Sequence, residues 1–112
     1  PGGCIDKTDS EPLAAGAREL FEETGFIADL SKGEIIGHVS PNPALQGNIC
    51  YTAYFRDVEQ SGSSAMEDTE DIETLTVPVS ELEKMIDSGM ITHGLVLNAI
   101  MFFRLKNQKE IA

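Results

Sequence analysis

The sequence predicts a mixed α/β (α+β) domain, because segments with helical and strand patterns alternate along its 112 residues. A helix is expected over residues 12–24, since Pro12 suits the first turn of a helix and Gly25 suits the position just after the last turn. Residues 34–39 are rich in β-branched side chains, and residues 48–58 alternate apolar with polar positions. Both segments are therefore expected to be strands.

Two further helices are expected near the C-terminus. The S-x-x-E pattern from Ser80 to Glu83 predicts a capping box, and Gly89 is expected to end the helix that follows. Thr92 is expected to cap a last helix over residues 93–106. The buried face of the first of these helices is predicted to be Leu82, Met85 and Ile86.

The helix expected over residues 12–24 carries a concentrated group of carboxylates. Glu19, Glu22 and Glu23 are spaced at i, i+3 and i+4, which places their side chains on one side of a helix. Such a group is often only a solvated acidic face. Alternatively it binds Mg²⁺, which proteins hold with a few carboxylates together with substrate phosphates. The opposite stripe is expected to be buried, and it consists of Leu13, Ala17, Leu20 and Thr24.

Composition limits the classes of partner. The length of 112 residues predicts a single domain, residues 1–112. Its net charge of −11 argues against nucleic acid or an anionic membrane as a partner. An anionic phosphate substrate would need metal ions to bridge it to the protein. Cys4 and Cys50 lack metal-ligand spacing, so free thiols in a reducing, cytoplasmic location are expected. No apolar run approaches the roughly 18–20 residues that span a bilayer.

The run REXXEEXG followed by an apolar residue, with a Gly-Gly loop and a Ser-Glu-Pro helix start before it, resembles the Nudix box. The resemblance covers residues 3–26. Matching positions are Arg18, Glu19, Leu20, Glu22, Glu23, Gly25 and Phe26, together with the glycine pair at 2–3. It implies a Nudix α/β/α sandwich with a mixed sheet, whose usual N-terminal strands would precede this chain. The domain would then be partial at its N-terminus.

The resemblance also implies roles for these residues. Nudix proteins mostly hydrolyse a nucleoside diphosphate linked to another group, with Mg²⁺ (or Mn²⁺) as cofactor. Glu22 and Glu23 would be catalytic as principal metal ligands, with Glu19 supporting them. The backbone carbonyl of Gly3 is a further candidate ligand. Arg18 would orient Glu22 one turn away.

One departure from the family pattern lies in the loop before the helix. Counting back from Arg18, the loop glutamate of the family falls on Ser10 and the box glycine falls on Cys4. The loop is therefore one residue longer than usual. Either Glu11 replaces the missing carboxylate after a local bulge, or that outer role is vacant.

Two loops carry substrate-binding candidates. The segment NPALQGN resembles a loop that lies beside the substrate in Nudix hydrolases of ADP-ribose. The resemblance implies that Asn42, Pro43 and Asn48 bind the substrate. The alternative is a proline-rich connection without a function. The acidic run at residues 67–73 resembles a mobile loop that supplies the water-activating carboxylate, with Glu70 as the first candidate and Asp68 as a substrate-binding or second candidate. Acidic loops are also commonly just solvated.

Three functions stay open on these residues. The first is Mg²⁺-dependent hydrolysis of ADP-ribose or a nucleotide sugar to a nucleoside monophosphate and a sugar phosphate. The second is Nudix hydrolysis of a nucleoside triphosphate, a dinucleoside polyphosphate or a coenzyme. The third is a non-catalytic, nucleotide-binding module. Family members that act on ADP-ribose commonly form homodimers, so a homodimer is expected by analogy.

Overall fold

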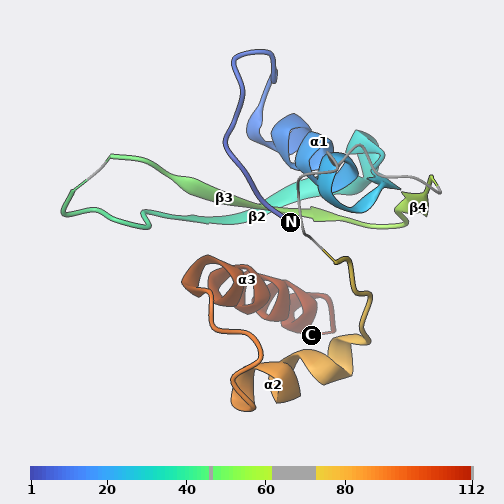
Figure 1. Cartoon of the computed structure of the whole chain (residues 1–112), viewed down its shortest axis with the longest axis vertical. Helices are drawn as coiled ribbons and strands as arrows, with labels where there is room; N and C mark the ends of the chain where they lie inside the picture. Colours follow the sequence, from blue (N-terminus) through green and yellow to red (C-terminus); the bar gives the residue numbers. More distant parts are fainter. Residues whose placement is uncertain (46, 62–72, 112) are drawn as a thin grey trace. The chain divides into compact units, whose positions relative to one another are not determined.

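The computed structural model describes residues 1–45, 47–61 and 73–111 (Figure 1). The chain is of the α+β class, as predicted. In order along the chain, the elements are α1 (Pro12–Thr24), β1 (Phe26–Ile27), the 3-10 helix η1 (Leu30–Lys32), β2 (Gly33–Val39), β3 (Cys50–Phe55), β4 (Glu59–Gln60), α2 (Val79–Asp87) and α3 (Gly94–Ile111). The strands form two small antiparallel sheets, in which β1 pairs with β4 and β2 pairs with β3 (Figure 1). Within this part of the chain, no helix combines the length and apolarity needed to cross a membrane.

The chain divides into two compact units. The first contains residues 1–35 and 53–74, and the second contains residues 36–52 and 75–112. The β2–β3 sheet contributes residues to both units. That residues 1–112 behave as a single domain stays a prediction.

Helix α1 has the bounds that its sequence predicts. Pro12 lies in the first turn, where its missing N–H leaves no hydrogen bond unmade. Gly25 ends the helix at a φ of 79°, a left-handed conformation that is costly for residues with a Cβ atom. Its N–H donates to the carbonyl oxygen of Phe21 at 2.9 Å.

Two glycines allow close packing in the first unit. A Cβ atom on Gly16 of α1 would lie 2.9 Å from the Cβ of Ala53 in β3 and 3.6 Å from the ring of Phe55. A Cβ atom on Gly33 would meet the same ring, with the Leu13 side chain 3.3 Å away. The helix therefore approaches the strand closely because position 16 has no side chain.

The change Gly16→Ala is expected to destabilise the protein, although alanine favours a helix over glycine by about 1 kcal/mol. Overpacking against Ala53 costs about 1–3 kcal/mol, so a net loss of about 1 kcal/mol is expected in urea unfolding. Adding Ala53→Gly removes the opposing methyl group and should recover part of the loss. An unchanged or raised free energy of unfolding in Gly16→Ala would contradict this packing.

The C-terminal end of α1 is fixed by residues distant in sequence. The N–H and Oγ of Ser61 donate to the carbonyl oxygen of Gly25 at 3.1 and 2.7 Å. The hydroxyl of Thr74 donates to the carbonyl oxygen of Glu23 at 3.3 Å. In the adjoining ribbon Phe26 lies opposite Gln60. These bonds occupy carbonyl groups that a helix end leaves without helical partners.

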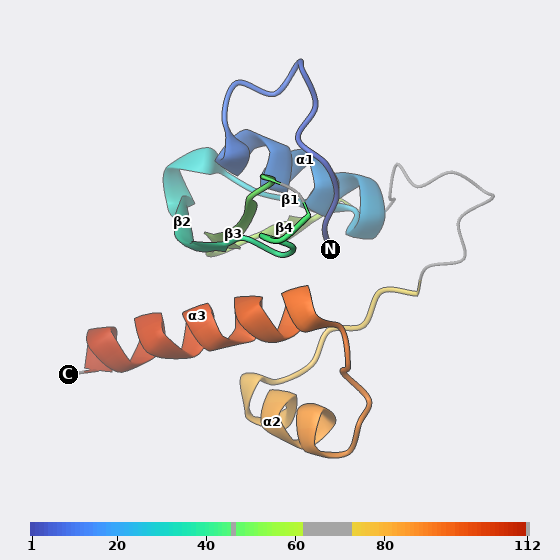
Figure 2. The same cartoon turned by 90° about the vertical axis from the view of Figure 1, so that its left-hand side faces the viewer.

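The second unit contains the β2–β3 hairpin turn and the helices α2 and α3, which lie side by side (Figures 1 and 2). The Phe102 ring lies where a Cβ atom on Gly37 would be. Glu83 of α2 pairs with Arg104 of α3 at 2.8 Å. Across the hairpin, the rings of His38 and Tyr51 are 6.0 Å apart.

The predicted starts of α2 and α3 were wrong in detail. Pro78 is the N-cap of α2, and its carbonyl oxygen accepts from the N–H of Glu81 at 2.9 Å, so Ser80 lies inside the first turn and forms no capping box. Proline fixes φ, and the helix begins at the next residue. Helix α3 begins after His93, whose Nδ1 accepts from the N–H of Leu95 at 3.1 Å, so the imidazole takes the place expected of Thr92.

Little of the described chain is fully buried. Ala15, 5% exposed, is the buried apolar residue among the residues that the structure describes. It precedes Arg18 by three residues and Glu19 by four, so it lies on the same face of α1. The stripe expected to be buried is only half-buried, and so is the predicted inner face of α2; these residues are Leu13, Ala17, Leu20, Thr24, Leu82, Met85 and Ile86.

Candidate functional site

The candidate site lies where the N-terminal loop, residues 1–11, crosses one face of α1 (Figure 1). The N–H of Gly2 donates to Oε2 of Glu23 at 3.0 Å. Gly3 lies against the carboxylate of Glu19, and a Cβ atom on Gly3 would collide with that carboxylate. The loop thus brings the glycine pair onto the carboxylate face of the helix.

Arg18 is the centre of the hydrogen bonds at this face. Its Nη1 donates to Oε1 of Glu19 at 3.0 Å and to Oε2 of Glu22 at 3.1 Å. Its Nη2 donates to the carbonyl oxygen of Cys4 at 3.0 Å and to Oδ2 of Asp9 at 2.9 Å, and its Nε donates to Oδ1 of Asp9 at 3.1 Å. The predicted contact between Arg18 and Glu22 is therefore present.

Asp9 is the residue that the sequence prediction missed. The loop carboxylate beside Arg18 is that of Asp9, not that of Glu11. Glu11 is the N-cap of α1 and makes no side-chain capping bond. The family spacing used above sets the loop glutamate six residues after the box glycine. Counting forward from Gly3 gives Asp9 directly. The extra residue of the loop thus lies between Asp9 and Arg18.

Asp9 is held in place from both sides. Its side chain is only 7% exposed, and Oδ2 also accepts from the N–H of Asp6 at 2.7 Å. The hydrogen bonds from Arg18, followed by that from Asp6, hold the pKa of Asp9 below its ordinary value of 3.8. The same pairing raises the pKa of Arg18, so the guanidinium keeps its charge at every working pH.

This pKa shift predicts a loss of stability in acid. Because the folded-state pKa of Asp9 is lowered, its stabilisation is present above the ordinary pKa of 3.8 and is lost as the pH falls through the lowered folded value. Urea unfolding followed from pH 6 to pH 2 should therefore show a steeper decline below about pH 4 for the wild type than for Asp9→Asn. Parallel declines in the two proteins would contradict this assignment.

The donor chemistry of the site fits a hard divalent cation. The carboxylates of Glu19, Glu22 and Glu23 and the backbone of Gly3 supply oxygen donors, which Mg²⁺ prefers. Glu22 is 45% exposed at its side chain and so has open access to a ligand. In the described part of the chain, no group of three or more His, Cys, Asp or Glu side chains converges on one point. Arg18 pairs with Glu19 and Glu22 in this arrangement, and its single positive charge is shared between them and Asp9.

The other predicted site residues belong to the second unit or lie outside the described residues. Asn42, Pro43 and Asn48 are exposed in the β2–β3 connection of the second unit, where the Asn42 carbonyl oxygen accepts from the N–H of Leu45 at 3.1 Å. Asp68 and Glu70 lie outside the described residues. That these residues take part in the site stays a prediction.

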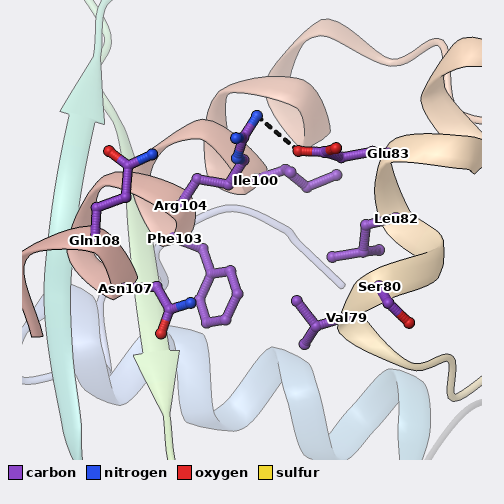
Figure 3. A pocket seen from close by; sticks show the side chains of 9 residues that line it. All are labelled: Val79, Ser80, Leu82, Glu83, Ile100, Phe103, Arg104, Asn107 and Gln108. Carbon is purple, nitrogen blue, oxygen red and sulfur yellow. Dashed lines mark ion pairs between the residues drawn. The ribbon is translucent and has the colours of Figure 1, made fainter. Parts of the chain in front are cut away.

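A separate pocket of about 430 Å³ lies between α2 and α3 (Figure 3). Apolar side chains, including Leu82, Ile100 and Phe103, line it together with the Glu83–Arg104 pair. None of the predicted site residues contributes to its lining.

Comparison with known proteins assigns the chain to a family. The family model described as NUDIX domain matches residues 1–94. A GDP-mannose pyrophosphatase from Salmonella arizonae is 30% identical over 99 residues, which are 86% of this chain and 51% of that protein. The chain thus spans about half the length of this curated relative. No solved structure matches the chain. Because the family model covers most of the chain, including the carboxylate face of α1 and the loop over it, the chain belongs to the NUDIX domain family.

Proposed function

We propose that this protein is a Nudix hydrolase that uses Mg²⁺ to split the diphosphate of a nucleotide sugar or of ADP-ribose. The observation that carries the proposal is the carboxylate face of α1, where Glu19, Glu22 and Glu23 lie under a glycine loop beside Arg18. The relative named GDP-mannose pyrophosphatase supports a nucleotide sugar as the first substrate to test.

In the proposed reaction, the oxygen of water forms a bond to one phosphorus while the bridging P–O bond breaks. The bridging oxygen leaves with the second phosphate, so the products are a nucleoside monophosphate and a sugar phosphate. The proton of the water passes to a carboxylate, for which Glu70 and the α1 glutamates are the candidates. When bound, Mg²⁺ supplies neutralisation of the developing charge and lowers the pKa of a bound water.

Residues of this chain are proposed to bind the metal, to orient its ligands and to contact the substrate. The glutamates of α1 and the carbonyl of Gly3 would hold the metal, with Glu22 and Glu23 as principal ligands. The N–H of Gly2 donates to Glu23 and so fixes one carboxylate oxygen in orientation. Arg18 orients Glu22 by a direct hydrogen bond. Asn42, Pro43, Asn48 and Asp68 are proposed to contact the substrate.

The test is product analysis after incubating the full-length protein with GDP-mannose and with ADP-ribose, each with Mg²⁺ or with EDTA. The expected products are GMP with mannose 1-phosphate, or AMP with ribose 5-phosphate, formed only when Mg²⁺ is present. Cleavage of other nucleoside diphosphate compounds instead would keep the reaction and change the substrate. Absence of turnover across such a panel would contradict the proposed activity.

A further inference from the structure

We propose that Asp9 is a positioning residue that limits Arg18 to a single nitrogen on the metal-binding carboxylates and thereby sets how tightly α1 binds a divalent cation. The proposal rests on the proposed function, because it concerns the same metal site. It follows from the unequal way in which the Arg18 guanidinium is shared between Asp9 and the helix glutamates.

The Asp9 side of the guanidinium is the stronger one. Nε and Nη2 donate in parallel to the two oxygens of Asp9 at 3.1 and 2.9 Å. This bidentate arrangement is the geometry in which arginine and a carboxylate bind most strongly. The Asp9 side chain is almost fully shielded from water, and the N–H of Asp6 fixes its Oδ2. Asp9 therefore forms a preorganised anchor for the guanidinium.

The glutamate side of the guanidinium is the weaker one. A single nitrogen, Nη1, is divided between Glu19 at 3.0 Å and Glu22 at 3.1 Å. Each of these contacts is monodentate, and the Glu22 side chain is 45% exposed to water. Of the two, the pair with Glu22 is the more exposed, and exposed ion pairs contribute little to stability. A divalent cation can therefore share the Glu22 carboxylate with Nη1 while the bonds to Asp9 persist.

Arg18 orients Glu22 through one nitrogen, but with two nitrogens on that carboxylate it would compete with the metal. Its charge cannot be removed by pH, so only its position decides whether it blocks the glutamates. The bonds to Asp9 and to the Cys4 carbonyl oxygen use Nε and Nη2, which leaves Nη1 alone to reach the glutamates. Without the carboxylate of Asp9, the planar guanidinium is free to turn and bind Glu22 with two nitrogens. The cation would then have to break a much stronger pair.

The experiment measures the Mg²⁺ dissociation constant of the full-length protein at pH 7 by calorimetric titration, with Mn²⁺ binding followed by electron paramagnetic resonance as a second readout. Asp9→Asn keeps the size of the side chain and removes its charge. The expected result is binding weakened by about 10–100-fold, the range found when the outer-shell groups around metal ligands are disrupted. Asp9→Glu should retain most of the affinity, because it keeps a carboxylate at this position.

Two controls separate positioning from simple loss of charge. Asp6→Asn removes one negative charge from the same loop, and its side-chain oxygen can still accept from the N–H of Thr8. It should leave the dissociation constant within about twofold of the wild type. In an Arg18→Met background, Asp9→Asn should have no further effect, because there is no guanidinium to position. Arg18→Lys provides a second background, which keeps the positive charge but cannot bind a carboxylate with two nitrogens.

Each other outcome has a defined meaning. Unchanged Mg²⁺ binding in Asp9→Asn overturns the inference and leaves the proposed function intact. An equal loss in the wild-type and Arg18→Met backgrounds also overturns it, since Asp9 would then act through its own charge. A wild-type protein that binds no Mg²⁺, or a Glu23→Gln variant that binds it normally, overturns the inference together with the metal site that the proposed function requires.

Discussion

Replacing Glu23 by Gln is expected to lower kcat/KM for the preferred substrate by on the order of a hundredfold or more, with little change in the free energy of unfolding. A hundredfold loss corresponds to about 2.7 kcal/mol, which lies within the several kcal/mol that a bound metal contributes to the transition state. The fold should persist, because the Gln carbonyl oxygen can still accept from the N–H of Gly2. Removing one charge also relieves repulsion with Glu19 by about 0.2–0.5 kcal/mol.

The measurement pairs steady-state kinetics with urea unfolding of the same preparations. Glu59→Gln is the matched control, because it makes the same chemical change at an exposed position in β4, far along the chain from the box. Its kcat/KM should equal that of the wild type. If Glu23→Gln lost activity and stability in equal proportion, its defect would be structural, and the assignment of Glu23 as a metal ligand would be wrong.

Arg18→Lys is expected to lower kcat/KM by about 10–100-fold, the range found when a residue that orients metal ligands is lost. Lysine keeps the positive charge but cannot reach Asp9, the Cys4 carbonyl oxygen and the glutamates together. In the structure, all three of the Arg18 side-chain nitrogens are engaged. The variant should also have a lower Tm, because the shielded Asp9 carboxylate loses its bidentate partner.

Thermal unfolding and kinetics of Arg18→Lys at several Mg²⁺ concentrations would test this. Raising the Mg²⁺ concentration should recover activity only in part, because added metal cannot reorient Glu22. Lys84→Arg, on the exposed surface of α2, is a matched control for exchanging these two residue types and should leave both values unchanged. Wild-type kinetics in Arg18→Lys would mean that charge alone suffices at this position.

The sequence was most informative where local chemistry determines the structure. Helix α1 has its predicted bounds because Pro12 and Gly25 act on their own backbone conformations and need no distant partner. The same reasoning was less successful at α2, where Ser80 fits a capping pattern but Pro78 precedes it and begins the helix two residues earlier than a serine cap would. A short motif cannot show which of two competing start signals prevails.

The prediction of the site was limited by the loop before α1. The carboxylate face of α1 and the contact between Arg18 and Glu22 follow from helical spacing, so they were predictable. Asp9 was not identified, because the count started from Arg18 and crossed the extra residue of the loop, which shifted the expected carboxylate to Ser10. Hydrogen bonds between a loop and a helix depend on how the loop bends, and residue spacing alone does not specify that bend.

The hydrogen bonds at the end of α1 have a consequence for how the first unit opens. Helix ends normally fray, and two-residue strands such as β1 and β4 are too short to persist alone. Here the Ser61 amide is bonded to the Gly25 carbonyl oxygen, which joins the end of β4 to the end of α1. Neither the last turn of α1 nor the β1–β4 ribbon can therefore open while the other stays folded. In hydrogen–deuterium exchange, the last turn of α1 and the β1–β4 ribbon should therefore lose protection together, as one cooperative unit.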